Sequence, residues 1–351
     1  MFFLVLEFAL ILSAVLLAGG LAYQYLGTAR DARRFPPPGR LVPLTDSGGP
    51  RLHLHGIGVS GPTVILDAGI GASSLSWSLV QSSAARFARV YAYDRAGYGW
   101  SNAPRRSSGP RIASRLAEEL RALLRAADVP GPYILVGHSF GGYVARLYAE
   151  RWPVEVAGLV MVDSPGATEW AHPNHDRRRQ HIGGALFSRI GGHLARLGVV
   201  RFCLNRLGRG SKAVPVTVTR AFGPSALALV TRMVGQVMKY PPGLRRVAQA
   251  HWSCPGPFAS LADHLAHLPE SAQEVAACGS LGDLPFVVMT AANPSAARAA
   301  QQDAVACQST RGRHIIAREG GHWLLLDQPE LVVQAIESVV EAMRQPVTGD
   351  S

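Results

Sequence analysis

A short segment near the middle of the chain has residue types suited to nucleophilic catalysis. The sequence GHSFG, at 137–141, follows the apolar run 134–136 and precedes a helical pattern over 143–151. A sharp turn from strand to helix holds its central residue in a strained conformation and lifts the side chain clear of the sheet, and flanking glycines avoid clashes. The helix N-terminus behind it favours developing negative charge. The segment therefore predicts Ser139 as a nucleophile.

A serine hydroxyl needs a general base before it becomes a good nucleophile. The sequence GGHW, at 320–323, follows the last strand-like run, 314–317. A loop at this place would carry His322 back over Ser139, in the chain order of serine followed by histidine. His322 is therefore the predicted base, and a histidine in a surface loop is the competing interpretation.

The elements that would position these residues alternate along the chain. Short apolar runs without polar alternation are typical of parallel strands buried on both faces. They cover 63–68, 90–93, 133–136, 159–162, 286–289 and 314–317. Amphipathic patterns over 111–127 and 328–344 predict helices. Strands that alternate with helices predict right-handed crossovers and a parallel sheet.

Several segments together resemble the α/β-hydrolase superfamily. They are GHSFGG at 137–142, DAGIG at 67–71, YDRAGYGWS at 93–101 and GGHW at 320–323. The resemblance covers a core of 50–166 and 281–345. It implies an α/β fold with a mostly parallel eight-stranded sheet, a helical cap inserted after the sixth strand, and hydrolysis through an acyl-enzyme without a cofactor.

An oxyanion hole completes such a site, because the tetrahedral intermediate needs two preorganised N–H donors. One donor is expected from the backbone of Phe140, the residue after the nucleophile. The other is expected from Ile70, in the turn 69–71, where ordinary turn glycines are the alternative. Asp94 and Arg95 are interpreted as structural residues that hold nearby loops.

The acid that orients the histidine is left open by the sequence. Many relatives carry it after the seventh strand, where this chain has Asn293. Asp303 follows further on, within a helical pattern. Other relatives place the acid after the sixth strand, and Asp163 matches that position. Asp163 is the preferred candidate, with Asp303, Asn293 or no acid as alternatives.

Residues 167–280 break the alternation of strands and helices and are expected to form the cap. They carry 12 Arg and 2 Lys against 5 acidic residues, and no Asp or Glu occurs from 177 to 262. The whole chain has a net charge of +11. This region is either a solvated surface or one that attracts anionic lipid headgroups or an anionic substrate. Without aromatic-interleaved basic motifs, nucleic acid is not an expected partner.

The N-terminal segment reads as a membrane anchor. Residues 8–26 lack charge and, as a helix, would span about 28 Å, close to the thickness of a bilayer core. Three arginines follow, at 30, 33 and 34, and then PPPG at 36–39. We therefore expect an anchor over 1–28 and a linker over 29–49, with a cleaved signal peptide or a buried core helix as alternatives. The arginines weakly favour a cytoplasmic body.

Cysteine and histidine spacing does not predict a metal site. No CxxC or CxxH pair occurs, and one disulfide is left open. The cysteines are Cys203, Cys254, Cys278 and Cys307. Three histidines at 172, 175 and 181 fit no common ligand set. His53 and His55 share one strand face and are expected to be ordinary exposed residues.

These patterns predict a membrane-tethered serine hydrolase of carboxylesterase or lipase type. Its partners would be a membrane and a small-molecule acyl substrate, with lipid-like compounds among the candidates. In this superfamily, haloalkane dehalogenases and epoxide hydrolases use Asp at the turn, so Ser139 argues for acyl transfer. One alternative is a non-catalytic tethered binding protein. Another is an iminopeptidase-type peptidase, which would need an acidic grip that the acid-free part of the cap lacks.

Overall fold

The computed structural model describes residues 1–45, 50–104, 109–210, 220 and 235–344. Parts of the expected linker (46–49) and cap (211–219 and 221–234), and residues 105–108 and 345 of the expected core, lie outside the described residues. The described chain divides into two units. The anchor unit comprises 1–36 and 184–262, and the sheet unit comprises 37–183 and 263–351.

The sheet unit is built on eight strands in the order β1-β2-β4-β3-β5-β6-β7-β8. The strands are β1 (Arg40–Pro43), β2 (Arg51–Ile57), β3 (Thr63–Asp67), β4 (Arg89–Tyr93), β5 (Tyr133–His138), β6 (Val156–Val162), β7 (Phe286–Thr290) and β8 (Gly312–Ile316). The pairs β1/β2 and β2/β4 are antiparallel, and all the other neighbouring strands are parallel. The predicted mostly parallel eight-stranded α/β sheet is therefore confirmed.

Burial explains why the central strands carry few polar side chains. Every residue of β3, β5 and β7 is buried. A strand covered on both faces gains from apolar side chains at successive positions, which gives the continuous runs seen in the sequence. Because these strands are parallel, their carboxyl ends meet at one edge of the sheet, and loops there can bring distant residues together.

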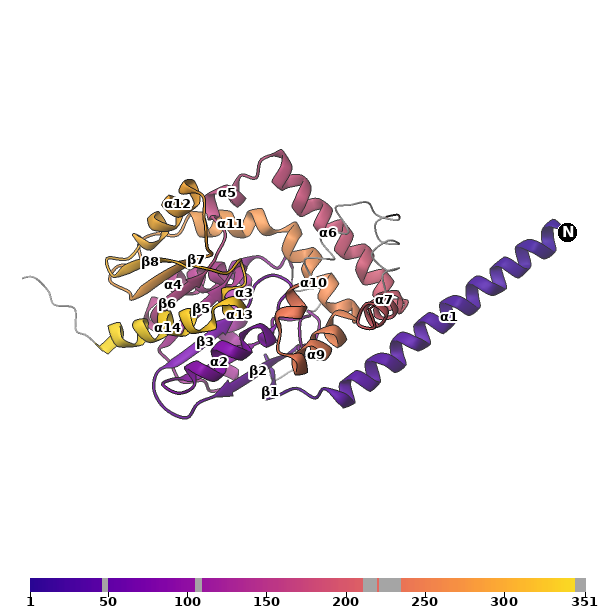
Figure 1. Ribbon diagram of the computed structural model, residues 1–351, viewed down its shortest axis with the longest axis horizontal. Coiled ribbons are helices and arrows are strands. Elements are labelled where there is room, and N and C mark those ends of the chain that lie inside the picture. Colours follow the sequence, from indigo (N-terminus) through magenta and orange to yellow (C-terminus); the bar gives the residue numbers. More distant parts are fainter. Residues whose placement is uncertain (46–49, 105–108, 211–219, 221–234, 345–351) are drawn as a thin grey trace, which may run out of the picture. The chain divides into compact units, whose positions relative to one another are not determined.

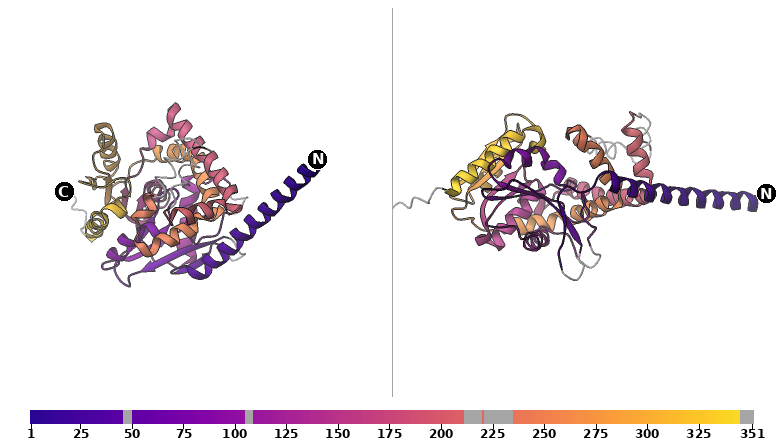
Figure 2. Two further views of the ribbon diagram at one scale, coloured as in Figure 1. Left: turned by 45° about the vertical axis from the view of Figure 1, so that its right-hand side comes forward. Right: turned by 90° about the horizontal axis from the view of Figure 1, so that it is seen from below.

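Helices cover both faces of this sheet (Figures 1 and 2). On one face, α2 (Ser78–Ala84) packs against α14 (Pro329–Arg344). On the other, α3 (Ala113–Ala126) packs against α4 (Phe140–Arg151), and α12 (Ala296–Ala306) packs on β7 and β8. The short elements are η1 (Ser74–Trp77), η3 (Pro153–Glu155) and α13 (Leu324–Asp327).

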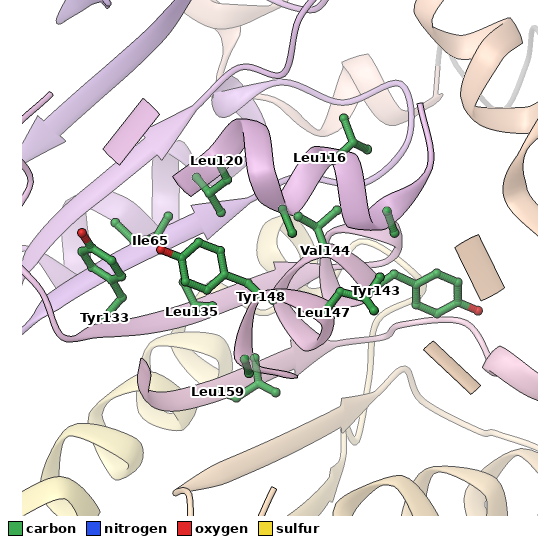
Figure 3. Packing of buried hydrophobic residues seen from close by; sticks show 14 of the residues in the cluster. Ile65, Leu116, Leu120, Tyr133, Leu135, Tyr143, Val144, Leu147, Tyr148 and Leu159 are labelled. Atoms are coloured by element: carbon green, nitrogen blue, oxygen red, sulfur yellow. The ribbon is translucent and has the colours of Figure 1, made fainter. Parts of the chain in front are cut away.

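The core beneath the site is a layer of aliphatic and aromatic side chains between α3, α4 and the sheet. Figure 3 shows Leu120 of α3 and Val144 of α4 beside Leu135 of β5. All three are fully buried or nearly so. Close packing of this kind fixes α4 against β5, and thereby the turn that joins them.

The described parts of the chain between β6 and β7 form helices joined by turns and short loops. Its helices are α5 (Ala167–Ala171), α6 (His175–Arg196), α7 (Val199–Leu207), α9 (Pro242–Trp252), α10 (Pro255–Ala266) and α11 (Leu268–Ala276). The two-unit division assigns α5 and α11 to the sheet unit, and α7 and α9 to the anchor unit.

The anchor unit also contains α1 (Phe2–Arg34), a helix long and apolar enough to cross a membrane. It continues beyond residue 28, where the anchor was expected to end, and β1 begins at Arg40. Only 35–39 therefore separate the helix from the first strand, because the proline run stops the helix and the next residues pair with β2.

Candidate active site

Ser139 sits in a strained turn between β5 and α4. Its backbone has φ of 53° and ψ of −122°, outside the regions that most side chains adopt. The N–H of Ser139 donates to the carbonyl of Val162 at 2.8 Å, which holds the turn against the end of β6. Such strain persists only where the surroundings impose it.

Two glycines make this turn possible, because backbone atoms occupy the space that a side chain would need. A Cβ on Gly137 would lie 2.3 Å from the carbonyl carbon of Gly141. A Cβ on Gly141 would lie 2.4 Å from the carbonyl oxygen of Asp67. Neither backbone can move without displacing β3 or β5. The spacing of the motif therefore has a steric cause in the packed sheet.

His322 lies against the same turn, in the loop between β8 and α13. Its carbonyl oxygen is 2.7 Å from Nε2 of His138, the residue before Ser139. The two imidazole rings are 4.8 Å apart, centroid to centroid. The N–H of Gly321 donates to the Asp327 carboxylate at 3.0 Å, which holds the loop from its other side. The structure thus brings the predicted base to the turn that carries the predicted nucleophile.

Asp163 is the acid that meets this histidine. Its Oδ2 lies 2.6 Å from Nδ1 of His322, and its Oδ1 accepts a hydrogen bond from the N–H of Ala291 at 3.1 Å. Nη2 of Arg298, from α12, is 3.7 Å from Oδ1. Burial disfavours the charged form of Asp163, but the bond and charge of His322, the Ala291 N–H and the Arg298 charge hold its pKa below the usual value.

The other two acid candidates lie elsewhere or have a different setting. Asp303, on α12, lies 2.7 Å from Nδ1 of His314, and Nε2 of that histidine is 2.8 Å from the hydroxyl of Thr290. Asn293 follows β7 with φ of 55°. Of the three candidates that the sequence left open, Asp163 is the one for which the described structure gives a contact within hydrogen-bonding distance of His322.

His138 is a buried neutral imidazole that supports His322. Burial, followed by the charge of His322, lowers the pKa of His138 to about 3. A carbonyl can only accept, so Nε2 of His138 must carry the hydrogen that binds the carbonyl of His322. The imidazole also contacts Trp323, with ring centroids 5.0 Å apart. Sequence reasoning gave this residue no role, although its place within the GHSFG motif was visible.

The two expected oxyanion donors flank Ser139. Phe140 is the first residue of α4, and Ile70 lies in the turn after β3. A Cβ on Gly69 would lie 3.2 Å from Cβ of Ser139, so this turn passes directly beside the serine. The segment therefore has the close backbone approach that an oxyanion hole requires.

A buried pair braces both of these segments and was missed from the sequence. The hydroxyl of Tyr98 lies 3.2 Å from Nδ1 of His264 and also bonds with the backbone of Gly71. The His264 ring meets the Phe140 ring edge to face at 5.6 Å. Tyr98 lies in the YDRAGYGWS segment, but nothing in the sequence near His264 indicates this contact.

Asp94 and Arg95 hold neighbouring loops. Asp94 accepts from the N–H groups of Ser74 and Trp100 at 2.7 and 3.1 Å. Its Oδ2 is 2.8 Å from Nδ1 of His53, which is fully buried. The expectation that His53 is exposed is therefore wrong, because β2 lies inside the sheet between β1 and β4.

Arg95 pairs with Asp67 at 2.7 Å and donates to the carbonyl of Ala68, just before the turn 69–71. Both side chains of this pair are buried. The pair ties the end of β4 to the end of β3, so it acts on the position of the turn that follows β3.

The described residues contain neither a cluster of metal ligands nor a disulfide. Among the described residues, no group of three His, Cys, Asp or Glu side chains could hold a metal ion. The four cysteines are free thiols. Burial raises the pKa of Cys203, Cys254 and Cys278, which makes these thiols poor nucleophiles.

Known proteins share parts of this sequence. The uncharacterized protein YqjL of Bacillus subtilis is 37% identical over 109 residues, which are 31% of this chain and 42% of that protein. An AB hydrolase superfamily protein of Gibberella zeae is 36% identical over 106 residues, which are 29% of this chain and 32% of that protein. The chain spans less than half the length of these curated relatives.

Solved structures share the fold at low sequence identity. A thermophilic esterase from Thermogutta terrifontis has a TM-score of 0.59 at 18% identity, over 87% of this chain and 98% of its own. A mutant of a putative epoxide hydrolase from Pseudomonas aeruginosa has a TM-score of 0.61 at 20% identity, over 88% of this chain and 98% of its own. The model of the alpha/beta hydrolase family matches residues 52–335. The chain therefore belongs to the alpha/beta hydrolase family.

Proposed function

We propose that the protein is a serine hydrolase that cleaves an ester or a related acyl bond through an acyl-enzyme. The observation that carries this proposal is the contact of 2.6 Å between Asp163 and His322, made beside the turn that presents Ser139. A buried carboxylate that contacts a histidine can stabilise the charge of that histidine when it acts as a base, and the nearby serine is then the nucleophile.

The proton positions follow from the hydrogen bonds. Asp163 is ionised because its pKa is lowered, so it accepts the proton on Nδ1 of His322. Nε2 of His322 is then left with a lone pair, which can take the proton of the Ser139 hydroxyl. The serine oxygen attacks the substrate carbonyl, and the same Nε2 returns the proton to the leaving group. A water molecule then attacks the acyl-enzyme while Nε2 takes up its proton, and the carboxylic acid product leaves as the proton returns to the oxygen of Ser139.

The negative charge of each tetrahedral intermediate would be stabilised by backbone N–H groups. We assign these donors to Phe140 and Ile70, from the N-terminus of α4 and the turn after β3. The α4 helix dipole adds a favourable field at the same point. Preorganised donors of this kind typically contribute about 3 kcal/mol each to the barrier reduction.

The nucleophile type separates this proposal from other reactions on the same fold. The solved structures that share the fold include both an esterase and a putative epoxide hydrolase. An epoxide hydrolase of this superfamily needs a carboxylate at the turn, whereas this chain has Ser139. A hydroxyl supports acyl transfer to water. The proposed substrate class is therefore an acyl compound, and lipid-like compounds are among the candidates.

The second part of the proposal is that α1 tethers the protein to a membrane. The apolar side chains of its first half are exposed to solvent in the anchor unit. An exposed apolar surface of this size is unfavourable in water and favourable in a bilayer.

Reaction of the full chain, purified in detergent micelles, with a fluorophosphonate probe tests the catalytic part. The probe should modify Ser139, identified by mass spectrometry of the labelled peptide. The Ser139→Ala variant should take up no probe at that peptide and should lose hydrolysis of p-nitrophenyl esters of graded acyl length. Ester hydrolysis that persists in Ser139→Ala would rule out this mechanism. A folded wild-type protein that takes up no probe would favour a binding protein on a hydrolase fold.

A further inference from the structure

The two halves of α1 have different surroundings. Side chains in 2–17 are largely exposed and mostly apolar. From Gly20 to Asp31 the same helix contacts other parts of the anchor unit. A Cβ on Gly20 would lie 2.5 Å from the carbonyl oxygen of Leu197, at the corner between α6 and α7. One unbroken helix therefore carries an exposed apolar half and a docked half.

A buried polar cluster holds the docked half. Arg201 of α7 is 5% exposed, and its Nε donates to Oε1 of Gln24 at 3.0 Å. Its Nη1 forms an ion pair with Asp31, about two turns further along α1. Nε2 of Gln24 donates to the carbonyl of Ser253 at 2.9 Å. Gly27 leaves room for the guanidinium, since a Cβ there would lie 2.6 Å from Nε of Arg201.

This cluster limits where the bilayer can begin. If hydrocarbon covered 8–26, as the hydropathy of the sequence suggests, Gln24 and Arg201 would lie within it. A stretch from 2 to 19 is about 27 Å long as a helix, which is close to the thickness of the hydrocarbon core. Tyr23 and Tyr25 then lie at the depth where tyrosine is enriched. The docked stretch that contains Arg201's partners follows just outside.

Helix α7 lies beside α1 at the point where the hydrocarbon core would end. Figure 1 shows α7 foreshortened beside the length of α1, and the view from below in Figure 2 agrees that the two helices cross steeply. A helix that crosses an upright span lies roughly parallel to the bilayer plane. Gly198, at the start of α7, approaches the carbonyl of Gly20. The position of α7 is therefore that of an interfacial helix.

The exposed stripe of α7 has the composition that this position requires. Val199 and Phe202 are 40% and 56% exposed, and Arg206, on the same stripe, is exposed as well. The adjacent stripe, which carries Arg201, contacts α1. Helix α9 packs on α7, and its corner with α10 contacts α1 further from the apolar half. The exposed stripe is therefore the flank of α7 that is turned away from α9.

Charge gives the stripe a preference for one kind of surface. Arg206 and Arg209 are exposed at the end of α7, and no acidic residue occurs in the sequence from 177 to 262. Basic residues close to an anionic bilayer are attracted by its negative surface potential. No carboxylate of this stretch would oppose that attraction.

We propose that α7 lies in the headgroup region of an anionic bilayer, with Val199 and Phe202 inserted, Arg206 and Arg209 on lipid phosphates, and the Arg201 cluster fixing its depth. This inference rests on the proposed membrane tether and goes beyond it, because a tether alone leaves the anchor unit free in water. It makes α7 a specific lipid-binding surface of the protein.

Photocrosslinking of the full chain tests this placement. The protein is reconstituted in vesicles of phosphatidylcholine with phosphatidylglycerol that carry a diazirine near the top of an acyl chain, and labelled peptides are identified by mass spectrometry. We expect label on peptides from both α1 and α7. Label on α7 should fall several-fold in vesicles of phosphatidylcholine alone, while label on α1 stays constant.

Variants separate the contributions. Phe202→Ser and the double variant Arg206→Gln with Arg209→Gln should each lower α7 labelling. The matched control, Arg86→Gln with Arg313→Gln, removes two exposed arginines from the sheet unit and should leave it unchanged. Arg201→Asp should also lower α7 labelling, and adding Asp31→Arg should restore part of it by reversing the ion pair.

The outcomes distinguish the inference from the function on which it rests. Label on α1 with none on α7, in protein that resists alkaline extraction, would overturn the interfacial placement and leave the tether standing. Extraction of the protein by alkali with no label on α1 would overturn the tether and the inference together. Ester hydrolysis is measured on the same samples, so a loss of lipid labelling with normal turnover would not count against the catalytic proposal.

Discussion

The carboxylate of Asp163, just after β6, lies 2.6 Å from Nδ1 of His322, which is 159 residues further along the chain. Only the sheet order can bring these residues together, because β6 and β8 both end at the edge where β5 turns into α4. The contact selects one acid among several candidates, and it can be tested directly.

Replacement of Asp163 by Asn should lower kcat/KM for a p-nitrophenyl ester by about 10⁴, because the amide can no longer hold the productive tautomer of His322. The fold should survive, since Asn is isosteric and can still occupy the site beside the Ala291 N–H. The matched control is Asp303→Asn, which removes the carboxylate that pairs with His314. Equal losses in the two variants would remove Asp163 from its proposed role.

Replacement of Arg298 by Gln should have a smaller effect of a different kind. Nη2 of Arg298 is 3.7 Å from Asp163 and also donates to the carbonyl of Ser164. The arginine is partly exposed, so solvent screening limits its effect to about 1 kcal/mol, or roughly fivefold in kcat/KM. Loss of this cation raises the pKa of Asp163, so the loss of kcat/KM should grow as the pH is lowered toward the range in which Asp163 takes up a proton. An unchanged profile would show that the guanidinium does not act on the carboxylate.

His138 should make the protein sensitive to acid. Its pKa is about 3 in the folded state against 6.5 for an ordinary histidine. Between these values the unfolded chain binds a proton that the folded chain does not, so stability falls as the pH decreases from 6.5 toward 3. The slope from this group is about 1.4 kcal/mol per pH unit. Urea unfolding at several pH values should give a shallower dependence for His138→Gln, whose amide can still donate to the carbonyl of His322.

Gly141→Ala should destabilise the fold. The added Cβ would lie 2.4 Å from the carbonyl oxygen of Asp67, which belongs to the central strand β3. Overpacking against backbone costs about 1–3 kcal/mol or more. The control is Gly183→Ala, where a Cβ meets nothing within 4 Å and lies within α6. Thermal unfolding should show a lower Tm for the first variant and an equal or higher Tm for the second.

Local sterics and hydropathy made part of this protein predictable from sequence. The run from 133 to 136 and the glycines around Ser139 predict a strand and a sharp turn, because a side chain at either glycine would meet backbone. The histidine at 322 could be found because few positions after a last strand can fold back over the sheet. These features depend on residues close together in the chain.

Other features depend on which distant segments become neighbours. Asp163 follows β6 and Asp303 lies on α12, and the structure shows that Asp163 contacts His322 whereas Asp303 contacts His314. His53 was expected to be exposed, yet Asp94, the residue just after β4, is its buried partner. The docked half of α1 was missed because Gln24 is an ordinary polar residue in sequence until Arg201 is placed beside it.

Three residues other than glycine that follow neighbouring strands have a positive φ. Ser139, Asp163 and Asn293 have φ of 53°, 44° and 55°. Asp and Asn tolerate this region, whereas serine at ψ of −122° does not, so the conformational penalty, about 1–3 kcal/mol, is concentrated at Ser139. A protein engineer seeking a heat-resistant but inert scaffold would put glycine at 139. The proposed nucleophile is thus also a residue that lowers the melting temperature of the protein.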